Sequence, residues 1–386
     1  MNVNQLRIST FPLICVLLIG TESATAFDRP EKSNISRDVL TSEQWNSLDR
    51  AVSRGLKYLA TQQRPDGSFA TIPMGQPGIT SLCVMAFLSR GHTPNQGPFG
   101  QQISRAIDFV LATQQKNGIL FDLKIDPYFE GDTPTHCAIY NHAISGLMLT
   151  EVYGMTDGAQ GDRIAKAIRK ALTFSLRYEE GFRKRPLDRG GFRYVRQLNK
   201  SSDSDLSITA WQLMFLRSAR NAQFDVPAER VETAMAYIRR CFDPRNRRFR
   251  YGLYGENPRR PPSRGMQGAA IVSLSMGGEH QSEMARAAGD WLLSHPFDRY
   301  NRSRSPKDRY HYSAFYCSQA MFQLGGEYWA KFFPRLMKTL TRYQKQNGSW
   351  DREGQDGDGR FGHSYTTALA LLALTPPYQL LPIYQR

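Results

Sequence analysis

Several kinds of residue that would build a redox centre, a metal site or a membrane anchor are scarce in this sequence. Its 386 residues include five cysteines, none in a Cys-x-x-Cys pair, and four of them lie in helix-like apolar runs beyond residue 26. Isolated cysteines of this kind are typical of buried thiols or incidental pairs, so we predict no metal and no cofactor. Beyond residue 26 no run of 18 uninterrupted apolar residues occurs, so no transmembrane anchor is predicted there.

Negative charge is also scarce. The chain has 50 lysines and arginines against 35 acidic residues, a net charge of +15, and the surplus lies in loop-like segments at 182–189, 239–250, 257–264 and 298–309. A basic balance is typical of nucleic-acid binding, but no recognised nucleic-acid module is present. The favoured interpretation is a solvated basic surface suited to an anionic envelope component.

The first 26 residues have the pattern of a secretory signal peptide. Arg7 precedes an apolar run at 11–20 that is too short to span a bilayer, and residues 24–26 form a small-x-small cleavage signal. We therefore expect an exported protein, periplasmic or secreted, with residues 27–40 as a linker. Export also argues against a specific nucleic-acid partner.

Strand-like alternation is scarce as well, and helical periodicity dominates. Six amphipathic stretches begin near Ala51, Ala106, Ala167, Val231, Ala285 and Leu336. Each is followed by a loop rich in glycine and arginine, and then by a stretch that is apolar on nearly all faces. Such an alternation indicates half-buried helices that alternate with fully buried helices.

Six such hairpins predict an all-α fold in which an outer ring of helices surrounds an inner ring. An open solenoid of stacked hairpins is the alternative, but the sixth hairpin is as apolar as the others and lacks the polar face of a cap. The sequence therefore predicts an (α/α)6 toroid, as one domain over residues 41–386.

The polar residues that open the inner helices should converge in such a toroid. All inner helices run in the same direction, so their N-termini, with unpaired N–H groups, lie at one electropositive rim. The candidate rim and cavity residues are Tyr140, Asn141, His142, Asp203, Asp205, Trp211, Arg264, Gln267, His311, Tyr312, Tyr316, His363 and Tyr365. For Trp211 and Tyr316, the favoured alternative is that they are ordinary core aromatics.

A short phrase, Gln-x3-Gly-x-aromatic, occurs in two of the loops between the helices. Its members are Gln63, Gly67 and Phe69 in the first hairpin, and Gln344, Gly348 and Trp350 in the sixth. The glycine permits a turn after the outer helix, the glutamine can bond exposed backbone groups, and the aromatic ring can pack on neighbouring helices. We therefore interpret the phrase as a structural clasp.

The phrase and the six hairpins together resemble the repeats of the squalene–hopene cyclase and protein prenyltransferase superfamily. The resemblance covers nearly the whole chain after the signal peptide and implies a terpenoid cyclase-like toroid with an apolar central cavity. In family enzymes that cavity holds an isoprenoid chain, so the resemblance implies an apolar, isoprenoid or diphosphate-bearing molecule as the partner of this chain.

The catalytic signatures of the superfamily are incomplete here. Cyclases use an Asp-x-Asp-Asp motif, of which Asp203 and Asp205 are present while Leu206 replaces the last acid. Asp205 is the candidate acid for alkene protonation, with Asp203 as its neighbour. The favoured alternative is that this segment caps the third inner helix. Likewise, His142 is a candidate acid or base, but a hydrogen-bonded structural histidine is favoured.

The zinc site of the prenyltransferases is not expected. No Asp-x-Cys pair occurs, and His311 alone cannot form the site. Two other functions stay open: a non-catalytic toroid that binds an envelope polymer or partner protein, and a carbohydrate-active lyase or hydrolase. For the latter, His142, Tyr312, His363 and Tyr365 are the candidate residues.

Overall fold

The computed structural model describes residues 39–125, 134–156, 158–180, 185–195, 204–254, 262–302, 308–354 and 357–385. All of them belong to one compact unit, Ile35–Arg386. Within these ranges, no helix is both long enough and apolar enough to cross a bilayer. Asp203 and the apolar run at 11–20 lie outside the described residues.

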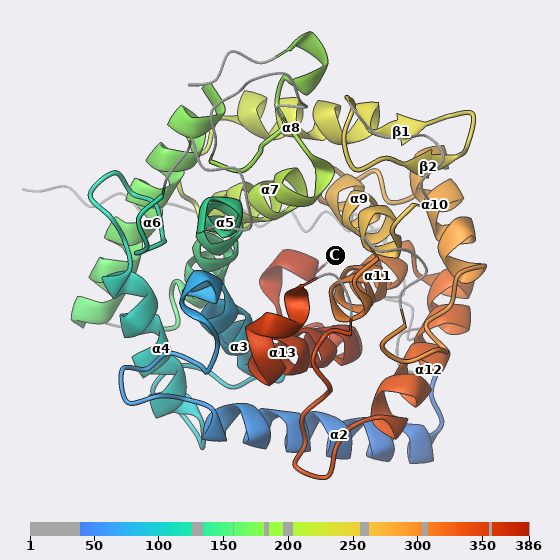
Figure 1. Cartoon of the computed structure of the whole chain (residues 1–386), viewed down its shortest axis with the longest axis horizontal. Coiled ribbons are helices and arrows are strands. Elements are labelled where there is room, and N and C mark those ends of the chain that lie inside the picture. The colour runs from blue at the N-terminus through green and yellow to red at the C-terminus, as the bar shows by residue number, and fades with distance from the viewer. Residues whose placement is uncertain are drawn as a thin grey trace, which may run out of the picture. The chain divides into compact units, whose positions relative to one another are not determined.

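Helices build this unit, in two concentric rings (Figure 1). The outer helices are α2 (Ser42–Thr61), α4 (Gly100–Ala112), α6 (Gly158–Glu180), α8 (Ala228–Arg240), α10 (Glu283–Leu293) and α12 (Gly326–Arg342). The inner helices are α3 (Gly78–Leu88), α5 (Pro134–Val152), α7 (Leu206–Asn221), α9 (Arg264–Met276), α11 (Tyr310–Leu324) and α13 (Gly362–Leu374). The (α/α)6 toroid predicted from the repeats is confirmed.

Burial differs between the two rings as the sequence pattern requires. Outer helix α2 buries one stripe that includes Leu48, Val52, Leu56 and Leu59, whereas every residue of inner helix α3 is buried. An inner helix is enclosed by its two inner neighbours, its outer partner and the barrel interior, so all of its faces favour apolar residues. Apart from isolated bridges, strand structure in the described residues is confined to one hairpin of two short strands, β1 (Phe242–Asp243) and β2 (Arg248–Phe249).

The inner ring closes on itself. Each inner helix packs on the next along the chain, and α13 packs on α3, so that the first and last hairpins are neighbours (Figure 1). The outer ring is joined in the same place, because α12 contacts α2. The closed ring excludes the open solenoid.

The Gln-x3-Gly-x-aromatic phrase clasps neighbouring hairpins together. Gln344 Nε2 donates to the carbonyl of Gly348 in its own loop, at 2.8 Å, and to the carbonyl of Ala51 in α2, at 2.9 Å. Gln63 spans its own loop and α4 in the same way. Gly348 has φ +91°, and a Cβ there would overlap the carbonyl oxygen of Arg54 in α2. In these two loops the clasp therefore uses both the glutamine and the glycine.

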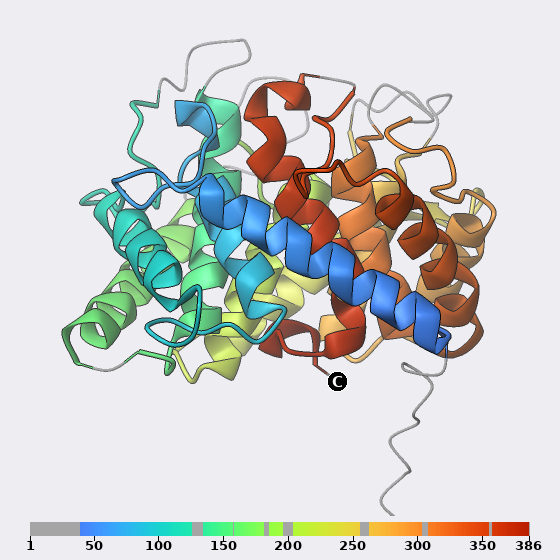
Figure 2. The same cartoon turned by 90° about the horizontal axis from the view of Figure 1, so that it is seen from below.

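The residues after α13 cover the end of the barrel where the inner helices finish. They form two short 3-10 turns, η4 (Pro376–Tyr378) and η5 (Pro382–Tyr384). The carboxylate of Glu151, late in α5, accepts a hydrogen bond from the Ile383 amide at 3.1 Å. Gln323, late in α11, donates to the carbonyl of Tyr384. Figure 2 places the C-terminus on this side of the unit.

Candidate functional site

A central cavity of about 640 Å³ lies at the N-terminal ends of the inner helices. Every inner helix contributes to its wall. The lining includes Ile79 and Leu82 of α3, Tyr140 and Ile144 of α5, Ser207 and Trp211 of α7, Met266 of α9, Tyr312 of α11, and Tyr365 and Leu369 of α13. The inner-helix ends are thus where a molecule can enter the barrel.

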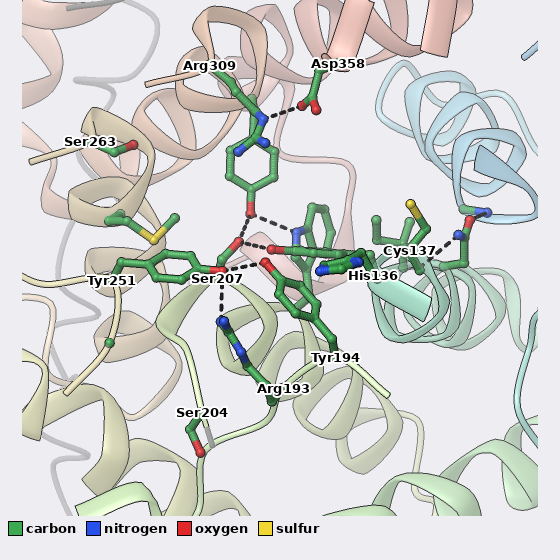
Figure 3. A pocket seen from close by; sticks show the side chains of 18 of the residues that line it. His136, Cys137, Arg193, Tyr194, Ser204, Ser207, Tyr251, Ser263, Arg309 and Asp358 are labelled. Atoms are coloured by element: carbon green, nitrogen blue, oxygen red, sulfur yellow. Dashed lines mark hydrogen bonds and ion pairs between the residues drawn. The ribbon is translucent and has the colours of Figure 1, made fainter. Parts of the chain in front are cut away.

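A chain of hydroxyl groups crosses the cavity wall (Figure 3). Tyr140 donates to Ser207 Oγ at 2.8 Å, and Ser207 Oγ lies 2.7 Å from the hydroxyl of Tyr312. The indole N–H of Trp211 donates to the same Tyr312 oxygen at 3.1 Å. Tyr140, Trp211 and Tyr312 are candidates from the sequence, and the structure brings them together around Ser207.

A second polar cluster comes from two loops, the one that precedes α7 and the one that follows β2. Arg193 donates to the hydroxyl of Tyr251 at 3.1 Å, and the hydroxyls of Tyr194 and Tyr251 are 2.7 Å apart (Figure 3). Arg193 also donates to Asp205 Oδ2 at 2.6 Å. The guanidinium also lies 4.3 Å from the Tyr194 ring centre, within range of a cation–π contact. Burial raises the pKa of both phenols, so both stay protonated.

Asp205 is the N-cap of α7 and is fully buried behind Arg193. Its Oδ1 accepts a hydrogen bond from the amide of Ile208 at 2.8 Å, which confirms the helix-cap interpretation. Burial raises the pKa of its carboxyl group, while the Arg193 guanidinium and the Ile208 amide act against that rise. With a donor on each oxygen, and without a place in the cavity wall, Asp205 has no atom free to meet a bound molecule.

His142 is fully buried between α5 and the second loop. Its Nδ1 accepts a hydrogen bond from the Leu120 amide at 3.2 Å, and its Nε2 lies 2.9 Å from Ser175 Oγ. Burial lowers the pKa of the imidazole to about 3. Thr209 and Gln267 make the equivalent bond to the loop amides of Phe192 and Phe249. His142 therefore holds a loop, in a position that other repeats fill with uncharged residues.

The remaining candidates on the inner helices divide by whether their side chains line the cavity. Asn141 and Tyr365 line the cavity, and Tyr365 donates to Asp358 at 3.4 Å. Four others bond to neighbouring loops or helices outside the cavity wall. These are Arg264 with Asp308, Gln267 with Phe249, His311 with Glu353, and His363 with the carbonyl of Trp350.

Arginine gives the cavity a basic lining near its mouth. Five arginines and two aspartates line it, a surplus of three positive charges. Arg193 and Arg309 form ion pairs with Asp205 and Asp358, whereas Arg248 has no ion pair with any described residue. Among the described residues, no three His, Cys, Asp or Glu side chains gather into a metal site.

The loop members of the site carry no sequence signal that would identify them. Arg193, Tyr194, Tyr251 and Arg309 lie in glycine- and arginine-rich connections, where no periodicity relates a residue to the barrel axis. Ser207 lies one residue into α7 and belongs to no motif. They are recognisable only once the inner helices are placed.

The architecture matches known toroids. One similar structure is a type II terpene cyclase from Scytonema, at 13% identity and a TM-score of 0.54, covering 89% of this chain and 100% of that one. Cellobiose 2-epimerase from Bacillus thermoamylovorans is 13% identical over 86% of this chain and 98% of its own, with a TM-score of 0.57. A family 76 α-mannanase from Bacteroides thetaiotaomicron is 11% identical over 86% and 96%, with a TM-score of 0.53.

At these identities the likenesses show the fold alone, an α/α toroid that a terpene cyclase, an epimerase and a mannanase share. No family model matches the sequence, and no curated protein matches it.

Proposed function

We propose that this protein binds an amphiphilic molecule of isoprenoid type, with its apolar body in the central cavity and a polar or anionic head at the mouth. The main support is the cavity itself, whose wall combines aliphatic and aromatic side chains from all six inner helices. Pockets with this balance, and a few placed polar groups, are typical ligand sites. The surplus of arginine at the mouth supports a negatively charged or strongly polar head.

The cavity size supports a small-molecule ligand. Its volume of about 640 Å³ lies within the range of about 300–1,000 Å³ that is typical of ligand pockets.

The geometry supports binding more strongly than acid or base catalysis. Both oxygens of Asp205 already accept hydrogen bonds, and protonating an alkene requires an unpaired, neutral carboxyl group next to the substrate. Burial also raises the pKa of the Tyr140 phenol, and this disfavours the phenolate that a lyase-type base would need.

Native mass spectrometry and tryptophan fluorescence would test the proposal. Polyprenyl alcohols and phosphates of increasing length would be titrated into the protein, since Trp211 in the cavity wall should report occupancy. Met266→Trp fills the cavity and should abolish binding. Met284→Trp, on outer helix α10, is the matched control and should retain it. Equal binding by both variants, or capture of an envelope polymer or protein instead, would refute the proposal.

We also propose that the protein is exported, where it would meet envelope lipids and anionic envelope components. The support is the signal-like pattern of residues 1–26. N-terminal sequencing of the native protein should start at Phe27. A protein that keeps Met1 would count against export and leave the binding proposal untouched.

A further inference from the structure

We propose that the bound molecule carries an oxygen atom in its apolar body, and that this oxygen accepts a hydrogen bond from the chain Tyr140–Ser207–Tyr312. This inference rests on the proposed function and narrows it, from isoprenoid amphiphiles in general to those that also carry an oxygen, such as a ketone, within the apolar body. A pure hydrocarbon in the same place would leave a buried donor without a partner.

The three hydroxyl groups of this chain hold more protons than they can share among themselves. Tyr140, Ser207 and Tyr312 each carry one O–H group, but their oxygens make only two contacts with one another, at 2.8 and 2.7 Å. Each contact uses one proton, so one O–H group remains. Because Tyr140 is the donor in the first contact, the remaining proton belongs to Ser207 or Tyr312. Among the described residues, neither hydroxyl has another acceptor.

Trp211 adds a further proton to the same group. Its indole N–H, which can only donate, points to the Tyr312 oxygen at 3.1 Å. It therefore takes up an acceptor site on Tyr312 and brings a fourth proton with a third contact. Four donors and three contacts again leave one O–H group over, at the cavity wall that all four residues line.

Tyr316 lies next to this group of hydroxyls. It follows Tyr312 by one helical turn on α11, with the two ring centres 5.1 Å apart, and it is fully buried. Tyr312 is the neighbour with which its hydroxyl interacts. Counted with the other three hydroxyls, Tyr316 adds one proton and one contact, so the surplus persists. A buried donor left unpaired is costly, and a ligand oxygen removes that cost.

Tyr365, which also lines the cavity, behaves differently. It donates to the carboxylate of Asp358, so its proton is already used. The surplus therefore belongs to the wall of the cavity that α5, α7 and α11 form. Tyr365 provides a matched control on a different inner helix, α13.

The first test compares two ligands. Farnesylacetone, an isoprenoid ketone, and the hydrocarbon with a methylene in place of its carbonyl would be titrated into the full-length protein. We expect the ketone to bind about tenfold more tightly, as one hydrogen bond to an otherwise unpaired donor predicts. The ketone would carry carbon-13 at its carbonyl. The infrared band of this carbonyl should lie at a lower frequency in the complex than for the same labelled ketone in hexane.

Variants assign the donor. Removing all four groups by Tyr140→Phe, Ser207→Ala, Trp211→Phe and Tyr312→Phe should abolish the ketone preference, so that the ratio of the two affinities falls to about one. Ser207→Ala alone frees two phenols and should retain the preference. Tyr365→Phe should also retain it. If the fourfold variant does not fold, the infrared band of the wild-type complex decides.

The outcomes separate the two proposals. Equal affinity for ketone and hydrocarbon, with an unshifted carbonyl band, would overturn this inference and leave the proposed function standing. Failure of these two ligands and of the polyprenyl alcohols and phosphates to bind would remove the proposed function and the inference with it.

Discussion

Buried charged side chains next to the cavity are held by partners, and this decides what they can do. Asp205 is enclosed by Arg193 and the first turn of α7, and Arg264 is enclosed by Asp308. A buried ion that loses its partner is strongly destabilising, whereas the intact pair contributes little by itself. Such residues therefore affect the fold before they affect any chemistry.

Replacing Asp205 with Asn should destabilise the protein by about 3 kcal/mol, because Arg193 would keep its buried charge without a counterion. Urea unfolding measures this change. Adding Arg193→Gln should recover part of the loss, since the double variant has no unpaired charge. A stable Asp205→Asn protein that no longer acts on a ligand would instead point to the acid role.

His142 should make the protein sensitive to acid. Its pKa is about 3 when folded and 6.5 in the unfolded reference, so the unfolded chain binds an extra proton between these values. Stability therefore falls as pH drops through 6.5, by about 2 kcal/mol at pH 5. His142→Gln copies the residue type of Gln267 in α9 and should lack this component. Parallel pH profiles for the two proteins would contradict the assignment.

The candidate residues divide for a physical reason. Tyr140, Trp211 and Tyr312 face the cavity, while Gln267 and His311 on similar helices face neighbouring loops. Inner helices are apolar on nearly all faces, so their periodicity reveals burial but not which side faces the barrel axis. The sequence therefore predicted the rim and its helices, but it could not show whether each side chain points to the cavity or to a neighbouring loop.

Among the elements, the loop clasp is the most regular. Gly67, Gly118, Gly190 and Gly348 all have positive φ, and a Cβ on each would overlap a carbonyl oxygen of the next outer helix. Gly190 lacks the glutamine of the phrase, because Pro186 stands at that position. The close approach of the backbone is thus more general than the phrase that predicted it.

Gly348→Ala should cost more than about 2 kcal/mol, since it combines a left-handed backbone with an overlap on Arg54. Gly278, just after α9, offers the matched comparison: its φ is +79° and nothing lies within 4 Å of the place that a Cβ would take. Gly278→Ala should therefore cost only about 1 kcal/mol, for the backbone conformation alone. Similar unfolding midpoints for both variants would argue against the clasp.

At the scale of the whole molecule, the fold prediction succeeded because the repeat supplies six independent copies of one signal. A single amphipathic stretch does not show which elements its helix packs against. Six alternating pairs, by contrast, leave few arrangements in which every apolar face is buried. The C-terminal cover has no such repetition, and the sequence did not predict that residues 376–385 would seal the far end of the barrel.

Glu151 joins that cover to the barrel and should make the free energy of unfolding depend on pH. Burial raises its pKa to about 7, above the ordinary 4.5, so the folded state holds a proton that the unfolded state releases between these values. Stability should therefore fall as pH rises from 4.5 to 7, by about 3 kcal/mol in total. Glu151→Gln should remove this slope in urea unfolding at pH 5 and pH 7.5. An unchanged slope would rule out Glu151 as its source.

The clasp between Gln344 and Ala51 joins residues 293 positions apart, and it has a consequence for biosynthesis. The N-terminal hairpin is made first, but its seam partners, α12 and α13, are among the last segments to leave the ribosome. Until then, the flank of α3 that α13 will cover stays open to water. Long-range closure of this kind slows folding and prolongs the exposure of apolar, aggregation-prone surface. Chaperone demand should therefore be greatest just before the final hairpin arrives.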